Sequence, residues 1–327
     1  MVGEASMGES AQNETSLLST LPKELPLEFF TEITSGFSKD RILRASAFGT
    51  FYTGILQNGL VVCVKKLAEN LQIPAGRQFD NEATNLLVAQ HENIVKLLGF
   101  CRQITKKVVE HNARFILVDK DECVLCYEHV PRGSLRDYLS DEANRTDWDT
   151  HFKIIKGICQ GVHFLHEGEY GRIVHMDLQP DNILLDDKMV PKIADFGLSR
   201  FFNREQSRLY TINVAGLKGY MAPEYLQRGE ISWQCDIYSL GVLIIEITTR
   251  EKNCCDDKDK SGREYISSVR RTWTDEHITI KYMSLDADRL QQVKACIDIG
   301  FKCVDVNQKN RPSTVEIVDR LHGKRAG

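Results

Sequence analysis

The sequence lacks an apolar run long enough to cross a membrane. The longest such run near its C-terminal half, YSLGVLIIEI from Tyr238 to Ile247, is about half the length of a membrane-spanning helix. The chain does not open with a basic and apolar leader, and Val2 rather than glycine follows Met1, so signals for secretion and N-myristoylation are missing. We therefore expect a cytoplasmic chain that is peripheral at the plasma membrane through a partner.

Metal-type cysteine pairs and a basic face are missing too. The ten cysteines are scattered, and in a cytoplasmic chain of this size they are expected to be reduced core residues. A net charge of −4 with mixed signs offers no basic face for nucleic acid. The 327 residues, 42% of them hydrophobic, are enough for a sizeable core in two packed units.

The first third of the chain is expected to be rich in β-structure. Residues 1–23 are small and polar and predict a flexible segment, whereas the apolar spacing of residues 25–37 predicts a short amphipathic helix. FGTFYTGIL and LVVCVKKL, joined through Asn58 and Gly59, predict a β-hairpin. A helix over about residues 77–90 follows, and then two strands, KLLGFC and ECVLCYEH.

From about Ser134 the pattern becomes mostly helical. Ile155, Ile158, Val162 and Leu165 recur at helical spacing, and DIYSLGVLIIEITT is apolar nearly all round, which predicts a buried central helix. The predicted organisation is a small sheet-rich unit followed by a larger helical unit.

Polar residues crowd into VHMDLQPDNILLDD, residues 174–187. Asp177 and Asn182 lie on either side of Pro180 in a loop that leads into the strand NILL, and Asp195 follows a short apolar run in KIADFGLSR. Hard oxygen ligands of this kind suit Mg²⁺, which completes its shell with water and phosphate oxygens.

Two charged residues upstream complete the pattern. Lys65 lies in VCVK on the hairpin and Glu82 lies in FDNEA on the following helix. Either residue alone would be interpreted as a solvated surface charge. Together with Asp177, Asn182 and Asp195 they are the parts of protein-kinase phosphoryl transfer.

The chain resembles the kinase domain of plant receptor-like and receptor-like cytoplasmic kinases, particularly a grass-expanded, cysteine-rich-receptor-kinase-like set. The resemblance covers about residues 25–322 and rests on LPLEFFTEITSGFS, IVKLLGFC, HFKIIKGICQGVHFLH, NILLDDKMVPKIADFGLSR, GYMAPEY and CIDIGFKCVDVNQKNRP. It implies an α+β, bilobal kinase-like fold, with an N-lobe over 24–128, a C-lobe over 129–322 and a tail over 323–327.

The resemblance also implies roles, with ATP and Mg²⁺ as cofactors. Lys65 would bridge the phosphates and pair with Glu82, Asp177 would accept the substrate hydroxyl proton, and Asn182 and Asp195 would hold Mg²⁺. The remaining nucleotide-binding positions would be Gly49 in the phosphate loop and, in the adenine pocket and hinge, Tyr127, Glu128, His129 and Val130. Structural roles would fall to Asp236 as a brace of the catalytic loop, to His175 as a buried histidine, and to a Glu224–Arg311 tie.

The phosphate loop departs from the family pattern. RASAFG keeps only Gly49, while Arg44 and Ser46 stand in the first two glycine places, where side chains obstruct close backbone approach to phosphates. Phe51 and Cys63 add volume where valine and alanine are usual. We expect weaker nucleotide binding; in the alternative interpretation the loop shifts and Arg44 or Ser46 still contacts phosphate.

Three further departures lie in the second half. Gln179 replaces the lysine that meets the transferred phosphoryl group, and Leu217 replaces a threonine that ties the substrate loop to the catalytic aspartate. Met176 replaces the arginine on which an activation-segment phosphate docks, which makes this a non-RD sequence.

Two hypotheses follow. The first is a serine/threonine kinase of low activity that phosphorylates a protein hydroxyl in plant signalling. The second is a pseudokinase that acts as a scaffold, in either case with a membrane receptor or an immune signalling complex as the expected partner. The five retained residues favour the enzyme, and the departures favour the scaffold.

Overall fold

The computed structural model describes residues 22–46, 48–68, 74–111, 114–144, 147–169, 171–253 and 262–323. The chain forms two compact units, one of residues 1–90 with 95–129, and one of residues 91–94 with 130–327. Most of the predicted flexible segment 1–23 and of the predicted tail 323–327 lies outside the described residues. Lys23 is described as the first residue of a strand.

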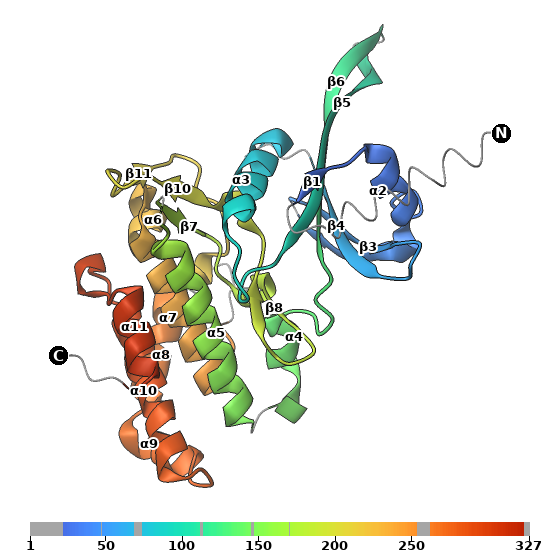
Figure 1. Cartoon of the computed structure of the whole chain (residues 1–327). Helices are drawn as coiled ribbons and strands as arrows, with labels where there is room; N and C mark the ends of the chain where they lie inside the picture. Colours follow the sequence, from blue (N-terminus) through green and yellow to red (C-terminus); the bar gives the residue numbers. More distant parts are fainter. Residues whose placement is uncertain are drawn as a thin grey trace. The chain divides into compact units, whose positions relative to one another are not determined.

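The first unit is built on one six-stranded sheet with the order β1-β5-β6-β4-β3-β2 (Figure 1). All its pairs are antiparallel except β1 with β5. The elements of this unit are β1 (Lys23–Glu24), α2 (Leu27–Ile33), the 3-10 turn η1 (Lys39–Arg41), β2 (Ile42–Ser46), β3 (Gly49–Ile55), β4 (Val61–Leu67), α3 (Ala75–Val88), β5 (Leu97–His111) and β6 (Arg114–Glu128).

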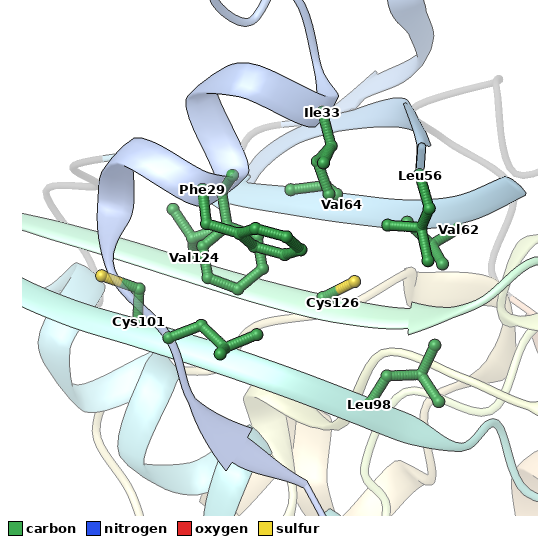
Figure 2. Close-up of a cluster of buried hydrophobic side chains, with 11 residues drawn as sticks. Phe29, Ile33, Leu56, Val62, Val64, Leu98, Cys101, Val124 and Cys126 are labelled. Carbon is green, nitrogen blue, oxygen red and sulfur yellow. The ribbon is translucent and has the colours of Figure 1, made fainter. Parts of the chain in front are cut away.

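One face of this sheet packs against α2. Figure 2 shows Phe29 and Ile33 of the helix lying over Val64 and Val124 of the strands. Phe29, Phe30 and Ile33 are buried, which confirms the helix predicted from their spacing. Since successive side chains of a strand point to opposite faces, Val62, Val64, Val124 and Cys126 belong to this apolar face.

The residues between them point to the other face. Phe51 pairs with Lys65, Cys63 with Tyr127, and Lys65 with Leu125, so these five side chains line the sheet face opposite α2. Glu82 of α3 meets this second face through its contact with Lys65. The alternation of β4 therefore places its valines in the core and Lys65 on the opposite face.

The predicted β3–β4 hairpin is confirmed, with Gly59 at φ +83° and an Asn58 side chain that accepts a hydrogen bond from the Leu60 backbone. The helix predicted over 77–90 is α3. The two following strands are much longer than predicted, since β5 and β6 continue as a two-stranded ribbon well past the sheet.

The second unit is mainly helical (Figure 1). Its helices are α4 (Leu135–Ser140), α5 (Trp148–His166), α6 (Pro223–Arg228), α7 (Trp233–Thr249), α8 (Gly262–Thr272), α9 (Asp275–Lys281), α10 (Ala287–Cys303) and α11 (Thr314–Leu321). Its strands form three short pairs: β7 (Arg172–Val174) with β10 (Arg200–Phe202), β8 (Ile183–Leu185) with β9 (Pro191–Ile193), and β11 (Leu209–Tyr210) with β12 (Glu230–Ile231).

The buried central helix predicted from its sequence is α7. All its residues from Cys235 to Thr249 are buried, and it packs against α5 and α10. Gly241 lets α10 approach closely, because a Cβ atom there would lie 2.9 Å from the Gly300 carbonyl oxygen. A sheet-rich unit and a helical unit confirm the predicted α+β class. Among the described residues, the helices are all too short or too polar to span a bilayer.

Candidate active site

Lys65 and Glu82 form a buried ion pair in the first unit. Lys65 Nζ lies 2.6 Å from Glu82 Oε2, and the two side chains are 0% and 1% exposed. The pairing implied by the resemblance is therefore present. Because removal of one partner would leave a buried charge unpaired, the pair fixes the lysine ammonium on this face of the sheet.

Tyr127 also holds Glu82, a contact that sequence reasoning missed. Its hydroxyl donates a 2.7 Å hydrogen bond to Glu82 Oε1, so each carboxylate oxygen of Glu82 has a separate donor. The register could have suggested this contact, since β4 and β6 place Tyr127 and Lys65 on one face. Tyr127 thus acts on α3 through its hydroxyl in addition to any contact of its ring with a nucleotide.

Phe51 lies beside the lysine. Lys65 Nζ is 5.3 Å from the centre of the Phe51 ring, and the Arg44 guanidinium is 6.0 Å from the same ring. Both contacts lie within the reach of a cation–π interaction. The aromatic ring that stands in the valine position is thus a neighbour of the candidate phosphate-binding lysine.

The turn between β2 and β3 uses its own polar groups. Ser46 Oγ donates to the Gly49 carbonyl oxygen at 3.1 Å and accepts from the Phe48 backbone at 3.2 Å. At Gly49 a Cβ atom would lie 2.6 Å from the Lys66 carbonyl oxygen, which explains why glycine stands there. The Ser46 hydroxyl is thus engaged inside the turn.

The predicted hinge residues fall at the junction of the two units. Glu128, in the first unit, accepts a hydrogen bond from the Lys96 backbone at 2.9 Å through Oε1, so its side chain is directed toward Lys96. Val130, the first residue after the junction, is 9% exposed.

In the second unit the loop 174–182 is held by Asp236 of α7. Asp236 Oδ2 accepts from the His175 backbone at 2.7 Å and Oδ1 accepts from the Met176 backbone at 2.9 Å, which confirms the predicted brace. Asp236 Oδ2 also lies 2.9 Å from His166 Nε2. Met176 has φ +68°, a strained conformation for a residue with a side chain, and the brace holds it there.

His175 is fully buried, as predicted. Its Nε2 lies 3.1 Å from the Ala194 carbonyl oxygen, and its Nδ1 accepts from the Asp177 backbone at 3.2 Å. Burial lowers the pKa of His175 below its usual range. The ring is therefore neutral at pH 7, and it links the loop to the strand end before Asp195.

Asp177 is enclosed by two amide donors. Gln179 Nε2 donates to Asp177 Oδ1 at 2.9 Å, and Asn182 Nδ2 donates to Asp177 Oδ2 at 2.7 Å and to its carbonyl oxygen at 2.9 Å. Sequence reasoning brought these three residues into one loop, but it missed that Gln179 binds the carboxylate directly. A neutral donor therefore occupies one oxygen of the candidate base.

Asn182 and Asp195 provide oxygen atoms suited to a divalent metal. The Asn182 side chain donates both of its hydrogen bonds through Nδ2, and among the described residues its Oδ1 receives no hydrogen bond. The Ala194 backbone donates to the Asn182 carbonyl oxygen at 2.8 Å, which brings the segment before Asp195 against the loop. An amide and a carboxylate oxygen fit Mg²⁺, so the residues present are compatible with this ion.

Leu217 lies beyond a glycine that touches Asp177. A Cβ atom at Gly216 (φ +119°) would lie 3.2 Å from Asp177 Oδ1, so the chain before Leu217 approaches the loop 174–182 through bare backbone. Leu217 itself has no hydroxyl to add a hydrogen bond. The predicted tie between Glu224 and Arg311 is confirmed, with two contacts of 2.5 and 2.8 Å.

Comparison with known sequences matches residues 37–321 to the protein kinase domain. The chain belongs to the protein kinase family. Cysteine-rich receptor-like protein kinase 44 of Arabidopsis thaliana is 35% identical to this kinase domain over 309 residues, which are 92% of the chain and 77% of that relative.

Other relatives are longer receptor-like kinases. Cysteine-rich receptor-like protein kinase 26 of Arabidopsis thaliana is 34% identical over 320 residues, 95% of this chain and 45% of the relative. The G-type lectin S-receptor-like serine/threonine-protein kinase RKS1 from the same plant is 35% identical over 307 residues, 91% of this chain and 35% of the relative. The chain thus spans less than half of these two relatives, and the predicted kinship with plant receptor-like kinases is confirmed.

Proposed function

We propose that this kinase domain is a serine/threonine kinase of low activity that transfers the γ-phosphoryl group of ATP to a protein hydroxyl. The observation that carries the proposal is the enclosed carboxylate of Asp177, held by Asn182 in a loop that buried Asp236 braces. A carboxylate held in this way suits a group that accepts a proton from a substrate hydroxyl.

Each unit contributes a part of the reaction. Lys65, fixed by Glu82, would bind phosphate oxygens, and Asn182 with Asp195 would hold Mg²⁺, which neutralises phosphate charge when it is bound. Gly49 would allow close backbone approach to the phosphates, and Tyr127, Glu128 and Val130 would lie near the adenine. Phosphoryl transfer needs mainly positioning and charge stabilisation, so these fixed groups are the chain's own contribution.

Low activity follows from Gln179. Its amide donates to Asp177 Oδ1 and brings no positive charge. If the missing charge is comparable to one preorganised donor, the loss in rate is roughly 10²–10³. Phe51 lies beside Lys65, and Arg44 lies beside Phe51, so both side chains would take up space near the phosphates.

The alternative is a pseudokinase that acts as a scaffold in receptor or immune signalling. The observation that favours it is the turn between β2 and β3. The Ser46 hydroxyl forms hydrogen bonds within this turn, and the turn keeps a single glycine. In both cases the partners would be proteins, and the chain would be cytoplasmic and peripheral at the plasma membrane through a receptor partner.

The deciding experiment measures Mg²⁺-dependent phosphate transfer from labelled ATP to the protein itself and to a generic protein substrate. Asp195→Ala is the matched control, because Asp195 contributes to metal binding and lies outside the Asp236 brace. Transfer above the Asp195→Ala level establishes the enzyme. Equal signals from the two folded proteins would reject it in favour of the scaffold.

A further inference from the structure

The outer part of β5 and β6 forms a ribbon with open edges. The pairing of β1 with β5 ends at Phe100, and β4 reaches β6 only from Val124 onward, whereas β5 and β6 pair with each other out to His111 and Arg114. Figure 1 shows these two strands leaving the sheet together. Within the described part of the chain, both edges of this outer ribbon (residues 103–111 and 114–122) lack a strand partner, and such edges are templates for further pairing.

The outer ribbon also exposes large apolar side chains. Ile104, Val108, Phe115 and Leu117 share one face, and their exposed fractions are 65%, 59%, 78% and 66%. A lone two-stranded ribbon is only marginally stable in water. The four apolar side chains share their face with the charged residues Lys106, Glu110, Asp119 and Asp121. Pairing of an open ribbon edge with another strand would widen the sheet and cover part of these apolar side chains.

The charges at the base of the ribbon are paired within the chain. Lys106 Nζ lies 3.2 Å from Asp119, and Arg102 lies 2.8 Å from Asp80. Lys120 is likewise paired with Glu122. Because these charges neutralise one another, the ribbon presents no field of one sign that would select a strongly charged partner.

The orientation of the β5 edge follows from one hydrogen bond. The Leu25 backbone donates to the Phe100 carbonyl oxygen at 2.9 Å, so the backbone groups of Phe100 point to the β1 side. Strand geometry repeats every two residues, so the backbone groups of Lys106, Val108 and Glu110 point to the same open side.

We infer that the open β5 edge binds a second copy of this chain, strand to antiparallel strand, about a two-fold axis at Val108. In this register Val108 faces Val108 of the second copy, and Lys106 faces Glu110 of the second copy twice. Opposite charges directly across an antiparallel pair stabilise it, and the apolar row of Leu117 and Val108 continues into the second copy.

Charge favours this register over those centred on a charged residue. An axis at Lys106, Lys107 or Glu110 sets two equal charges opposite each other, which destabilises the pair. An edge lysine normally discourages pairing because it meets no partner, but here Lys106 lies between Asp119 and Glu110 of the second copy. The β6 edge is less suited to such pairing. If Arg114 faced Glu122 of a second copy there, Asp119 and Asp121 would face apolar residues of that copy.

The test is sedimentation of the full chain between roughly 1 and 100 μM, the range suited to a small interface. We expect a reversible dimer. Lys106→Glu and Glu110→Lys should each weaken self-association by about tenfold or more, because each sets two like-charge pairs across the interface. Lys107→Glu is the matched control, since Lys107 faces Val109 of the second copy and the dimer should persist.

Complementation makes the test specific. A mixture of Lys106→Glu and Glu110→Lys proteins should form a heterodimer, and the double variant should again form a homodimer, because both restore opposite charges. A wild-type monomer over the whole range would overturn the inference. A dimer that both single variants retain would also overturn it. If such a dimer were lost only in Phe115→Ser, the contact would lie on the face that carries Phe115 and not on the β5 edge. This inference does not depend on kinase activity.

Discussion

The catalytic loop 174–182 and the turn 44–49 are the two polar segments on which phosphoryl transfer would depend, and they are supported very differently. The loop is anchored from below by Asp236, which is fully buried on α7 and accepts hydrogen bonds from the His175 and Met176 backbones. The turn rests on local bonds of Ser46 within six residues.

This difference in support indicates which of the two segments tolerates amino-acid substitutions. A substitution that breaks the Asp236 hydrogen bonds disturbs a buried network, so we expect a large cost in the free energy of unfolding. A substitution in the turn replaces one local conformation by another, so glycines can be lost there while the sheet remains. The retained aspartates and the altered turn are therefore compatible within one stable kinase domain.

The largest expected effect comes from removing the brace. Asp236→Ala leaves the His175 and Met176 backbone donors unpaired in the interior, and we expect a loss of about 3–5 kcal/mol in the free energy of unfolding. Urea denaturation measures it. Asp298→Ala, which removes a half-exposed carboxylate paired with Arg320, should cost at most about 1 kcal/mol. Equal losses would show that Asp236 contributes no more than a surface pair.

The second prediction concerns the turn. Because Arg44, Ser46 and Phe51 crowd it, Mg-ATP at millimolar concentration should add less than about 2.7 kcal/mol of stability, and so raise the melting temperature by less than about 5 °C. Thermal denaturation with and without Mg-ATP measures the shift. A larger shift that vanishes in Lys65→Ala would show that the pocket is intact and that these three side chains do not obstruct it.

The third prediction returns to the loop. Gln179→Lys supplies the missing charge beside Asp177 and should raise the catalytic rate by roughly tenfold, about 1.4 kcal/mol, with little change in substrate affinity. Steady-state phosphorylation assays separate the two parameters, with Asp177→Asn as the inactive control. An unchanged rate in a folded Gln179→Lys protein would mean that charge beside Asp177 does not limit transfer.

The smallest effect is expected in the segment after Asp195. Met176 is buried and brings no cation to dock a phosphate, so replacing Ser207, Tyr210 and Thr211 together by non-phosphorylatable residues should change activity by less than about threefold. Kinase assays on the folded triple variant test this. A large loss would assign the docking role to another cation, with Arg228 near Glu230 as the first candidate.

Much of the fold could be predicted because short sequence patterns, such as apolar spacing and turn residues, indicate its helices and strands. The spacing of Phe29, Phe30 and Ile33 predicted α2, and Asn58 with Gly59 predicted the β3–β4 turn. The outer ribbon was missed because QITKKVVEH mixes charges with exposed apolar residues and lacks the alternation of a half-buried strand.

For the candidate site, motif order predicted which polar residues belong together. The predicted contact between Lys65 and Glu82 is present in the structure. It could not predict the Tyr127 hydroxyl on Glu82 or the Gln179 amide on Asp177. These contacts depend on strand register and on side-chain rotamers, which are set by packing rather than by spacing along the chain.

The sequence by itself determined the fold class and the two polar segments, because periodicity and motif order are local properties of the chain. The residues that would bind phosphate and metal stay predictions. Only the tertiary structure decided how each charged group is satisfied. A buried ion takes the partners that folding brings to it, so the donors on Glu82, the amides around Asp177 and the open edge of β5 became visible only once strands and helices were packed.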